Sequence, residues 1–334
     1  KQNNQPEPVP SSSPPVRTTS SLRKTNQNPA FHISDKLTGL NSKPEHQPLI
    51  FPPAAAETLT SQDAKDISNA LLAPVNHSSI TIAAWNVNGI HSVFKSGCLV
   101  HFLMTKRPTI LLLSEVKLGF KRLEKCKALH NLLYLMGYKF TYWHIQLTQR
   151  GGKNGVAAFC RIEPMLVLKG FLHPGATMDD SEDGRVLTLL YPFATIVQTY
   201  VPCSSLPANS PLITRPLTLK QIQVKNAFRR KFDLNLRLHL RHLQVCKTPP
   251  LIWTGDLNIV PLEEDISGGV INNSDFPGCT YAERTRFHAT RNTFDLADSW
   301  AHFNQGAFVS RFSYFRDRYD RAENIGQRLD HFMI

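Results

Sequence analysis

Leu251-Ile252-Trp253-Thr254-Gly255-Asp256-Leu257-Asn258 is the stretch of this sequence that decides the fold. A short apolar run ends in a glycine, which is followed by an acid and, two positions later, by an amide. This pattern predicts a buried strand that leaves the core and presents polar side chains at its carboxyl end. Alternation along an extended chain places Asp256 and Asn258 on the same side. Ligands of open α/β sheets bind at such strand ends, although an acid here is also typical of a turn or a helix N-cap.

Three other apolar runs in the chain end in, or enclose, a carboxylate or an amide. The polar residues concerned are Asn86, Asn88, Glu115 and Asp330. If the four strands are neighbours, these side chains converge with Asp256 and Asn258 on one spot. Clustered carboxylates repel each other and are tolerated where a cation lies among them. Oxygen ligands without a cysteine or histidine cluster favour Mg²⁺ or Mn²⁺ over zinc, and such a cation suits phosphoryl chemistry.

The charge of the chain points to a polyanionic partner. The net charge is +12, and residues 1–77 carry seven basic and six acidic residues, so nearly all of the excess lies in the remainder. A folded domain with this excess suggests nucleic acid, with solubility as the alternative explanation. No apolar run approaches the roughly 20 residues of a membrane helix, so we expect no membrane contact. The scattered cysteines argue against zinc fingers and a disulfide framework, and for a reducing compartment.

The composition changes near residue 78. Residues 1–77 are rich in Pro, Ser, Asn and Gln and hold 11 of the 23 prolines, which predicts a disordered tail with at most a short helix at Ser61–Leu72. From residue 78 onward, many strands with few helices between them indicate an α+β fold and argue against a simple alternating βαβ sheet. A helix is expected around His101–Lys106. The expected strands, besides the last apolar segment, are Ser79–Trp85, Thr109–Ser114, Gly155–Arg161, Arg185–Leu190, Ala194–Val201 and Leu251–Asp256.

One long helix is predicted at Gln221–Lys247. Apolar residues recur along it at spacings of three and four, which indicates one buried face. These residues are Val224, Phe228, Phe232, Leu236, Leu240 and Leu243. Basic residues decorate the same helix, and we interpret them as a solvated face, with contact to nucleic acid as the alternative. The basic residues are Arg229, Arg230, Lys231, Arg237 and Arg241.

Nine short segments from about residue 80 to the end form a recognisable series. They are Trp85–Gly89, Ser114–Lys117, Gly155–Ala157, Gly184–Val186, Tyr200–Pro202, Gly255–Ile259, Leu296–Trp300, Phe312–Phe315 and Arg328–Asp330. In this order they resemble the exonuclease III-type apurinic/apyrimidinic (AP) endonucleases of the endonuclease/exonuclease/phosphatase superfamily. The resemblance implies a DNase I-like four-layer α/β sandwich, in which helices flank two mostly antiparallel sheets, with residues 78–334 as the catalytic domain.

The resemblance also implies roles for the polar residues at the strand ends. Glu115 would be the main metal ligand, with Asn88 beside it. Asp256 would orient or deprotonate the attacking water. Asn86 and Asn258 would hydrogen-bond the scissile phosphate or hold the ligands in place.

Further roles follow from the remaining segments. Tyr200 would donate its phenol hydrogen to a phosphate oxygen, and Asp330 would brace a catalytic histidine. Phe312 and Leu329 would line a small apolar pocket for the base-less sugar. Asp298 is expected to serve the structure.

Lys117 and Arg185 would contact the DNA backbone or brace the acids. The family's Ser-Asp-His segment, which supplies the catalytic histidine, has no counterpart up to Ile334. His331 is not a substitute, because it follows Asp330 directly in a strand and faces the opposite side. We therefore expect a domain that lacks its C-terminal strand, with severely impaired or no nuclease activity for this chain by itself.

The function that the resemblance implies is DNA repair. An enzyme of this family uses Mg²⁺, or Mn²⁺ in its place, to hydrolyse the phosphodiester 5′ to an abasic site in duplex DNA, with 3′-exonuclease or 3′-phosphodiesterase side activities. The alternatives are another superfamily phosphodiesterase, such as a retroelement endonuclease or a phosphoinositide phosphatase, and a non-catalytic DNA-binding fragment. We expect a monomer in the nucleus, with the mitochondrion as the alternative compartment.

Overall fold

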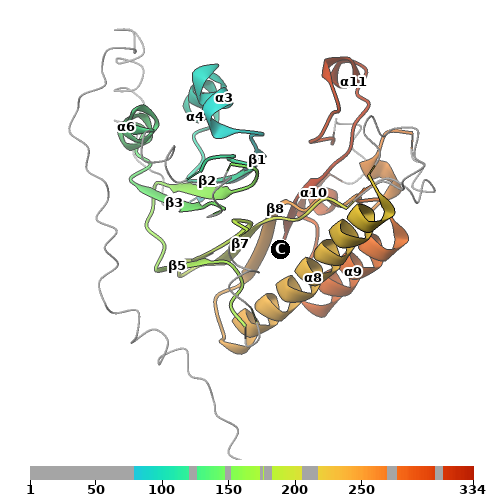
Figure 1. Ribbon diagram of the computed structural model, residues 1–334. Coiled ribbons are helices and arrows are strands. Elements are labelled where there is room, and N and C mark those ends of the chain that lie inside the picture. Colours follow the sequence, from blue (N-terminus) through green and yellow to red (C-terminus); the bar gives the residue numbers. More distant parts are fainter. Residues whose placement is uncertain are drawn as a thin grey trace, which may run out of the picture. The chain divides into compact units, whose positions relative to one another are not determined.

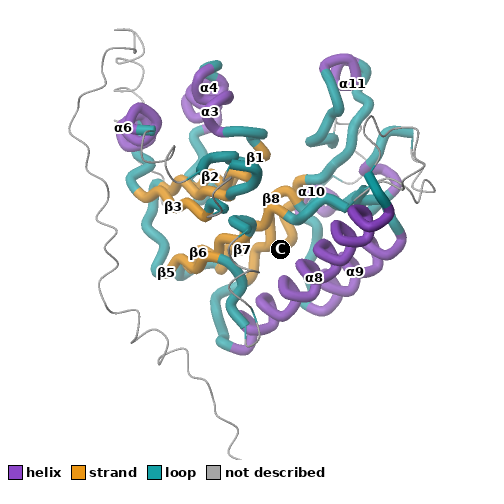
Figure 2. The backbone as a smooth tube through the Cα atoms, in the orientation of Figure 1, coloured by secondary structure: helices purple, strands orange, loops and turns teal. Residues whose placement is uncertain are grey.

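The structure, a computed structural model, describes residues 79–119, 126–146, 152–173, 176, 183–204, 217–268, 277–304 and 311–334. The predicted disordered tail and the short helix predicted at Ser61–Leu72 lie outside these residues. In the described part, two β-sheets carry helices on their outer faces (Figure 1). The tube in Figure 2 shows the same order of layers, helix, sheet, sheet and helix. The predicted four-layer sandwich is therefore confirmed.

The first sheet has the strand order β1-β2-β4-β3. Its members are β1 (Ile82–Asn86), β2 (Ile110–Ser114), β4 (Val156–Cys160) and β3 (Phe140–His144). β1 and β2 are parallel, and the other two pairings are antiparallel. The parallel pair brings the carboxyl ends of β1 and β2 to the same edge, with Asn86 beside Ser114 and therefore next to Glu115.

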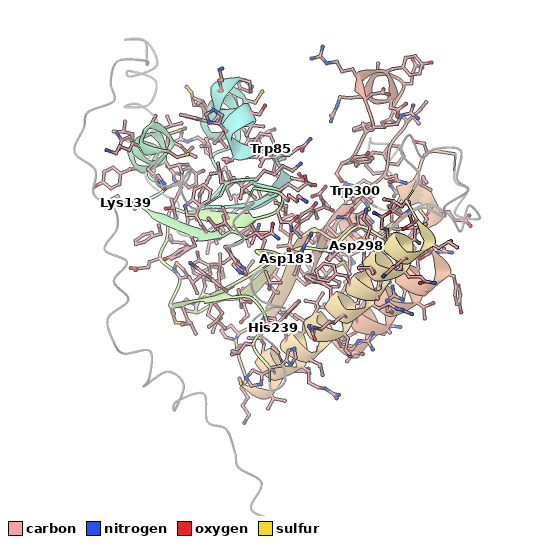
Figure 3. The ribbon with its side chains drawn as sticks, viewed as in Figure 1. Trp85, Lys139, Asp183, His239, Asp298 and Trp300 are labelled. Atoms are coloured by element: carbon pink, nitrogen blue, oxygen red, sulfur yellow. The ribbon has the colours of Figure 1, made fainter. Side chains whose placement is uncertain are left out.

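Successive side chains of β2 point alternately into two separate hydrophobic cores. Leu111 and Leu113 pack under the helices of the outer face, whereas Ile110 and Leu112 pack between the two sheets. All four side chains are fully buried, as the uninterrupted apolar run requires. The covering helices are α3 (Ile90–Lys95), α4 (Cys98–Lys106) and α6 (Lys127–Leu135). Trp85, labelled in Figure 3, packs its ring 5.2 Å from that of Phe102 in α4.

The second sheet has the strand order β5-β6-β7-β8-β9. Its members are β5 (Leu166–Lys169), β6 (Val186–Leu190), β7 (Thr195–Tyr200), β8 (Leu251–Asp256) and β9 (Asp330–Met333). Only β7 and β8 are parallel. Their register sets Tyr200 opposite Asp256, and the antiparallel pairing with β9 sets Asp256 opposite Asp330.

The outer face of the second sheet is covered by α8 (Leu219–Val245) and α9 (Tyr281–Thr293). The core under α8 starts at Phe232, so the predicted buried face is wrong for its first two members: Val224 and Phe228 are exposed. The interpretation of Arg229 as part of a solvated face is also wrong, because Arg229 is 3% exposed. The first turns of α8 extend beyond the core that the helix covers, so Val224 and Phe228 stay exposed. Arg229 lies one turn before the core begins, and its side chain points towards the sheet.

The predicted strands correspond to β1, β2, β4, β6, β7 and β8 within a few residues, and the long helix corresponds to α8. Five further elements, α3, β3, β5, α6 and α9, were not predicted from the sequence, because their apolar periodicity is short or irregular. Three short elements complete the described chain: the 3₁₀ turn η2 (Glu263–Asp265), α10 (Ser299–Phe303) and α11 (Arg318–Ala322). Within the described ranges, no helix combines the length and the apolar character needed to span a bilayer.

Candidate active site

The predicted site residues of both sheets meet at one end of the sandwich. The side-chain amide of Asn86 donates to Glu115 Oε1 at 3.0 Å and to Asp256 Oδ2 at 2.8 Å. The phenol of Tyr200 donates to the same Glu115 oxygen at 2.8 Å. One amide group therefore links the ends of β1, β2 and β8, and β7 joins them through Tyr200. These contacts confirm the convergence that the sequence predicted for Glu115 and Asp256.

Glu115 is held in its ionised form. Burial by itself would raise its pKa, but hydrogen bonds from Asn86, Lys117 and Tyr200 outweigh burial and lower it. Tyr200 responds in the opposite sense, because burial and the negative charge of Glu115 raise the pKa of its phenol. The phenol therefore stays protonated and remains a hydrogen-bond donor in the site.

Lys117 and Asn88 lie on the outer side of Glu115. The ammonium of Lys117 is 2.6 Å from Glu115 Oε2, and it also donates to Asn88 Oδ1. Asn88 in turn donates its backbone N–H to Asn86 Oδ1 at 3.0 Å. The two predicted metal ligands, Glu115 and Asn88, thus point their oxygens at the same positive charge.

Left-handed backbone turns bring these side chains together. Asn88, Glu115, Lys117 and Asn258 have φ angles of 46°, 52°, 51° and 45°. Asparagine tolerates this region, whereas glutamate and lysine adopt it rarely and at a cost of about 1 kcal/mol each. Such outliers gather at functional sites, where the surrounding structure holds them. Here the backbone N–H of Lys117 is bonded to Asn154 O at 3.0 Å.

Asp256 and Asp330 form a pair of neighbouring carboxyl groups. Burial raises the pKa of Asp256, and the negative charge of Asp330 raises it further. Asp256 accepts hydrogen bonds from Asn86 and from the backbone N–H of Asn258. Asp330 Oδ1 is buried and has no hydrogen-bond partner among the described residues, so it offers an acceptor to a further donor. The catalytic histidine that Asp330 would brace has no counterpart in the sequence up to Ile334, so this role of Asp330 stays a prediction.

Arg229 was missed as a site residue, although it fixes the loops that follow β7 and β8. Its Nη1 donates to Pro202 O at 2.8 Å and to Asn258 O at 3.0 Å, and its Nε donates to Asp233 Oδ1 at 2.9 Å. Glu283 from α9 lies 3.5 Å from Nη1. A signal was present in the sequence, because Arg229 stands three residues before Phe232, on the apolar face of the helix.

Asn258 and Arg185 brace the neighbouring strand. The amide of Asn258 donates to Val201 O at 2.8 Å. The guanidinium of Arg185 pairs with Asp183, labelled in Figure 3, and donates to Tyr200 O at 3.1 Å. It also lies 4.5 Å from the centre of the Tyr200 ring. Arg185 thus contacts Asp183 and Tyr200, and the roles expected of Asn258 and Arg185 at the acids and at the DNA phosphates stay predictions.

The remaining predicted residues lie around β9. Leu329 is buried in a small cluster with Val260 and Cys279. Phe312 is half-buried, with its ring centre 6.4 Å from that of Phe315. Their proposed role as walls of a sugar pocket stays a prediction.

The opposite face of β9 is structural, as predicted. His331 points away from Asp330, with its ring nitrogens 3.3 Å from Asp298 Oδ2 and 3.1 Å from Ile259 O. Asp298 caps α10 and pairs with the buried Arg328 at 2.7 Å. Figure 3 shows Asp298 and Trp300 close together, and the Arg328 guanidinium lies 5.4 Å from the Trp300 ring centre. The structural role expected of Asp298 is confirmed.

The donor set at Glu115 fits a hard divalent cation. Within the described ranges, no three His, Cys, Asp or Glu side chains come together as a metal-binding group. The oxygens of Glu115 and Asn88 nevertheless converge on one ammonium, so this position already holds a positive charge. Mg²⁺ is commonly bound by one or two carboxylates and keeps several waters, which suits a site of this kind.

The match to known proteins agrees with this geometry. Residues 83–334 match the Endonuclease/Exonuclease/phosphatase family, and the chain belongs to this family. The resemblance to AP endonucleases that the sequence motifs indicated is therefore confirmed by the family and by the relatives.

Two curated relatives illustrate the similarity. A DNA-(apurinic or apyrimidinic site) endonuclease of Dictyostelium discoideum is 29% identical over 260 residues, which are 78% of this chain and 63% of the relative. The DNA repair nuclease APEX1 of Danio rerio is 29% identical over 258 residues, which are 77% of this chain and 73% of the relative. The chain thus spans less than two thirds of the Dictyostelium relative.

Solved structures confirm the fold. A 3′ phosphatase from Neisseria, bound to a product DNA hairpin, superposes with a TM-score of 0.57 at 23% identity and covers 76% of this chain and 86% of its own. The catalytic domain of Xenopus laevis APE2 gives a TM-score of 0.57 at 18% identity, covering 76% of this chain and 82% of its own. At these identities the likeness concerns the fold alone.

Proposed function

We propose that this protein is a Mg²⁺-dependent DNA repair endonuclease that hydrolyses the phosphodiester 5′ to abasic sites in duplex DNA. The observation that carries the proposal is the double hydrogen bond of Asn86 to Glu115 and Asp256, which joins the two sheets at the predicted catalytic residues. The relatives named as AP endonucleases support the choice of substrate. The net charge of +12 suits a polyanionic substrate.

The described residues divide the work at the phosphate. Asp256 is buried at the end of β8 and orients the attacking water or takes its proton. Tyr200 keeps its phenol hydrogen, which it donates to Glu115 until substrate binds and can then donate to a phosphate oxygen. Asn86 and Asn258 hold the acids and the strand ends so that these groups do not reorganise during the reaction.

Glu115 Oε2 and Asn88 Oδ1 are the atoms that would hold the cation. When bound, Mg²⁺ neutralises charge on the phosphate and on the leaving oxygen. Glu115 is ionised in the protein, and its other oxygen is already fixed by Asn86 and Tyr200. The carboxylate therefore presents one oxygen in a fixed direction.

The test is cleavage of two labelled duplexes, one intact and one with a single abasic site, by the full-length protein with Mg²⁺ and with EDTA. We expect incision 5′ to the abasic site with Mg²⁺ only. Asp256→Asn should lower kcat about 10³-fold or more, because the proton acceptor is lost. The matched control is Asp295→Asn, which makes the same change at an exposed residue.

Three results would contradict the proposal. Equal cleavage of both duplexes would remove the abasic assignment, and full activity in EDTA would remove the metal. Unchanged activity of Asp256→Asn would remove the assigned site. A duplex with a recessed 3′ end, included in the same assay, reports the 3′-exonuclease activity separately.

A further inference from the structure

Lys117 contacts both residues assigned to the metal. Its ammonium lies 2.6 Å from Glu115 Oε2 and donates to Asn88 Oδ1. A lysine that only braced an acid would need one of these contacts. Two contacts, to the two atoms expected to hold the cation, place its charge at the position of the metal.

The other contacts of Glu115 determine which of its two oxygens is free to bind a metal. Oε1 already accepts hydrogen bonds from Asn86 at 3.0 Å and from Tyr200 at 2.8 Å. A cation that binds Glu115 without breaking these bonds must bind at Oε2, where Lys117 sits. The metal and the ammonium therefore compete for the same oxygen.

The backbone of Lys117 is fixed, and its side chain has room to move. The N–H of Lys117 is bonded to Asn154 O, and the N–H of the buried Val116 is bonded to Gly155 O. The side chain of Lys117 is 34% exposed, against 18% for Glu115. A four-carbon stem anchored at a fixed Cα can carry the ammonium from the acid into water without moving the loop.

We propose that Lys117 is a built-in counter-cation that occupies the metal position and must move aside when a divalent cation binds. This inference rests on the proposed function, because it concerns the same site. Lys117 holds Glu115 and Asn88 in place before the metal arrives, and it lowers the affinity for the metal, since binding has to break the ion pair. The site is thereby kept ordered without holding its cation tightly.

The experiment titrates the full-length protein with Mn²⁺ alone, without DNA, and follows free Mn²⁺ by electron paramagnetic resonance. We expect Lys117→Met to bind Mn²⁺ about fivefold more tightly than the wild type, the upper end of the scale for a partly exposed ion pair. Lys117→Arg keeps the charge and should stay within about twofold of the wild type. Lys153→Met removes the same charge from an exposed position nearby and should also stay within about twofold.

The outcomes separate the two proposals. If Lys117→Met binds Mn²⁺ no more tightly than the wild type while Glu115→Gln abolishes binding, the metal site stands and the inference fails. If neither wild type nor Lys117→Met binds Mn²⁺, the metal dependence of the proposed function fails with it. Lys117→Gln and the metal-induced rise in melting temperature repeat the comparison should Lys117→Met fold poorly; equal rises in wild type and variant would overturn the inference.

Discussion

The two halves of the site are built on different principles. The half from the first sheet consists of Asn86, Asn88, Glu115 and Lys117, which hold one another through side chains that are partly exposed. The half from the second sheet consists of Tyr200, Asp256, Asn258 and Asp330. The loops after β7 and β8 are held by the buried Arg229 of α8, which also pairs with Glu283 of α9. Lys117 is 34% exposed, whereas Asp256 is 4% exposed.

This difference shows how one site can combine a rigid part with a part whose contacts can change. The proposed function requires the half from the first sheet to accept and release a cation, which suits side-chain contacts that can change partners. The half from the second sheet has to present a carboxylate at a constant position, so it uses contacts to backbone carbonyls that no side-chain rotation can replace. We therefore expect substitutions in the second half to affect stability more than comparable substitutions in the first.

The largest expected effect is that of an added methyl group at Gly255. Its φ of 123° is unfavourable for other residues, and a Cβ there would lie 2.2 Å from the carbonyl oxygen of Thr199. The obstacle is backbone in the centre of a sheet and cannot move aside. Gly255→Ala should lower the free energy of unfolding by about 4 kcal/mol or more, measured by chemical denaturation.

Gly89 is the matched control in the first half. It has a φ of 110°, but a Cβ there would meet nothing within 4 Å. Gly89→Ala should therefore cost only the conformational strain of about 1–2 kcal/mol. Equal losses for the two variants would contradict the expected difference between the halves.

The second prediction concerns Arg229. Arg229→Met removes the guanidinium that pairs with the buried Glu283 and Asp233. Asp233 keeps its ion pair with Arg286 at 2.7 Å, so the uncompensated charge inside the protein is that of Glu283. We expect a loss of about 3–4 kcal/mol in the free energy of unfolding, together with reduced kcat on abasic DNA, because the loops after β7 and β8 lose their anchor. Arg230→Met changes an exposed residue on the same helix and should alter neither quantity. If Arg229→Met melts at the same temperature as the wild type, the anchoring role is refuted.

The third prediction is an acid sensitivity of the second half that originates at His239, which Figure 3 places at α8. The pKa of His239 is lowered from 6.5 to about 4, mainly by burial and with smaller contributions in the same direction from the nearby His173 and His242. Its Nδ1 accepts a hydrogen bond from the backbone N–H of Leu172, and Nε2 faces Thr188 Oγ1 at 2.9 Å. A proton on Nδ1 would break the bond from Leu172.

The unfolded chain takes up this proton as the pH falls below 6.5, while the folded protein takes it up only near pH 4. The stability that His239 contributes is therefore complete above pH 6.5 and is lost towards pH 4, by at most about 3 kcal/mol. His239→Gln should remove this slope from denaturation curves, whereas the exposed His302→Gln should keep it. The raised pKa of Asp256 favours the folded state at low pH, so it gives the free energy of unfolding the opposite pH dependence. This contribution is the same in variant and wild type and cancels in their difference.

The smallest expected effect is that of Arg185→Met on DNA binding. The charge of Arg185 is already paired with Asp183, and its guanidinium rests on the Tyr200 ring. We expect the salt dependence of binding to abasic duplex to keep its slope, with a loss of stability of about 1 kcal/mol. A slope reduced by about one would instead identify Arg185 as a phosphate contact.

Much of the site was predictable because strand ends are a local pattern. Short apolar runs located β1, β2, β7 and β8. The residue types at their ends, acids and amides without a cysteine or histidine cluster, indicated a hard cation and phosphate chemistry. The order of the nine motifs then indicated the family. The missed strands β3 and β5 are short or half-exposed, so their alternation is weak.

The sequence by itself determined which residue types stand at the strand ends and that His331 faces away from Asp330, because both follow from the period of two along a strand. Only the tertiary structure decided that Asn86 reaches Asp256, 170 positions away, and that Arg229 is buried. Those facts depend on which strands become neighbours and on where the core ends under α8. Both are set by the packing of the two sheets and their helices, which no local pattern contains.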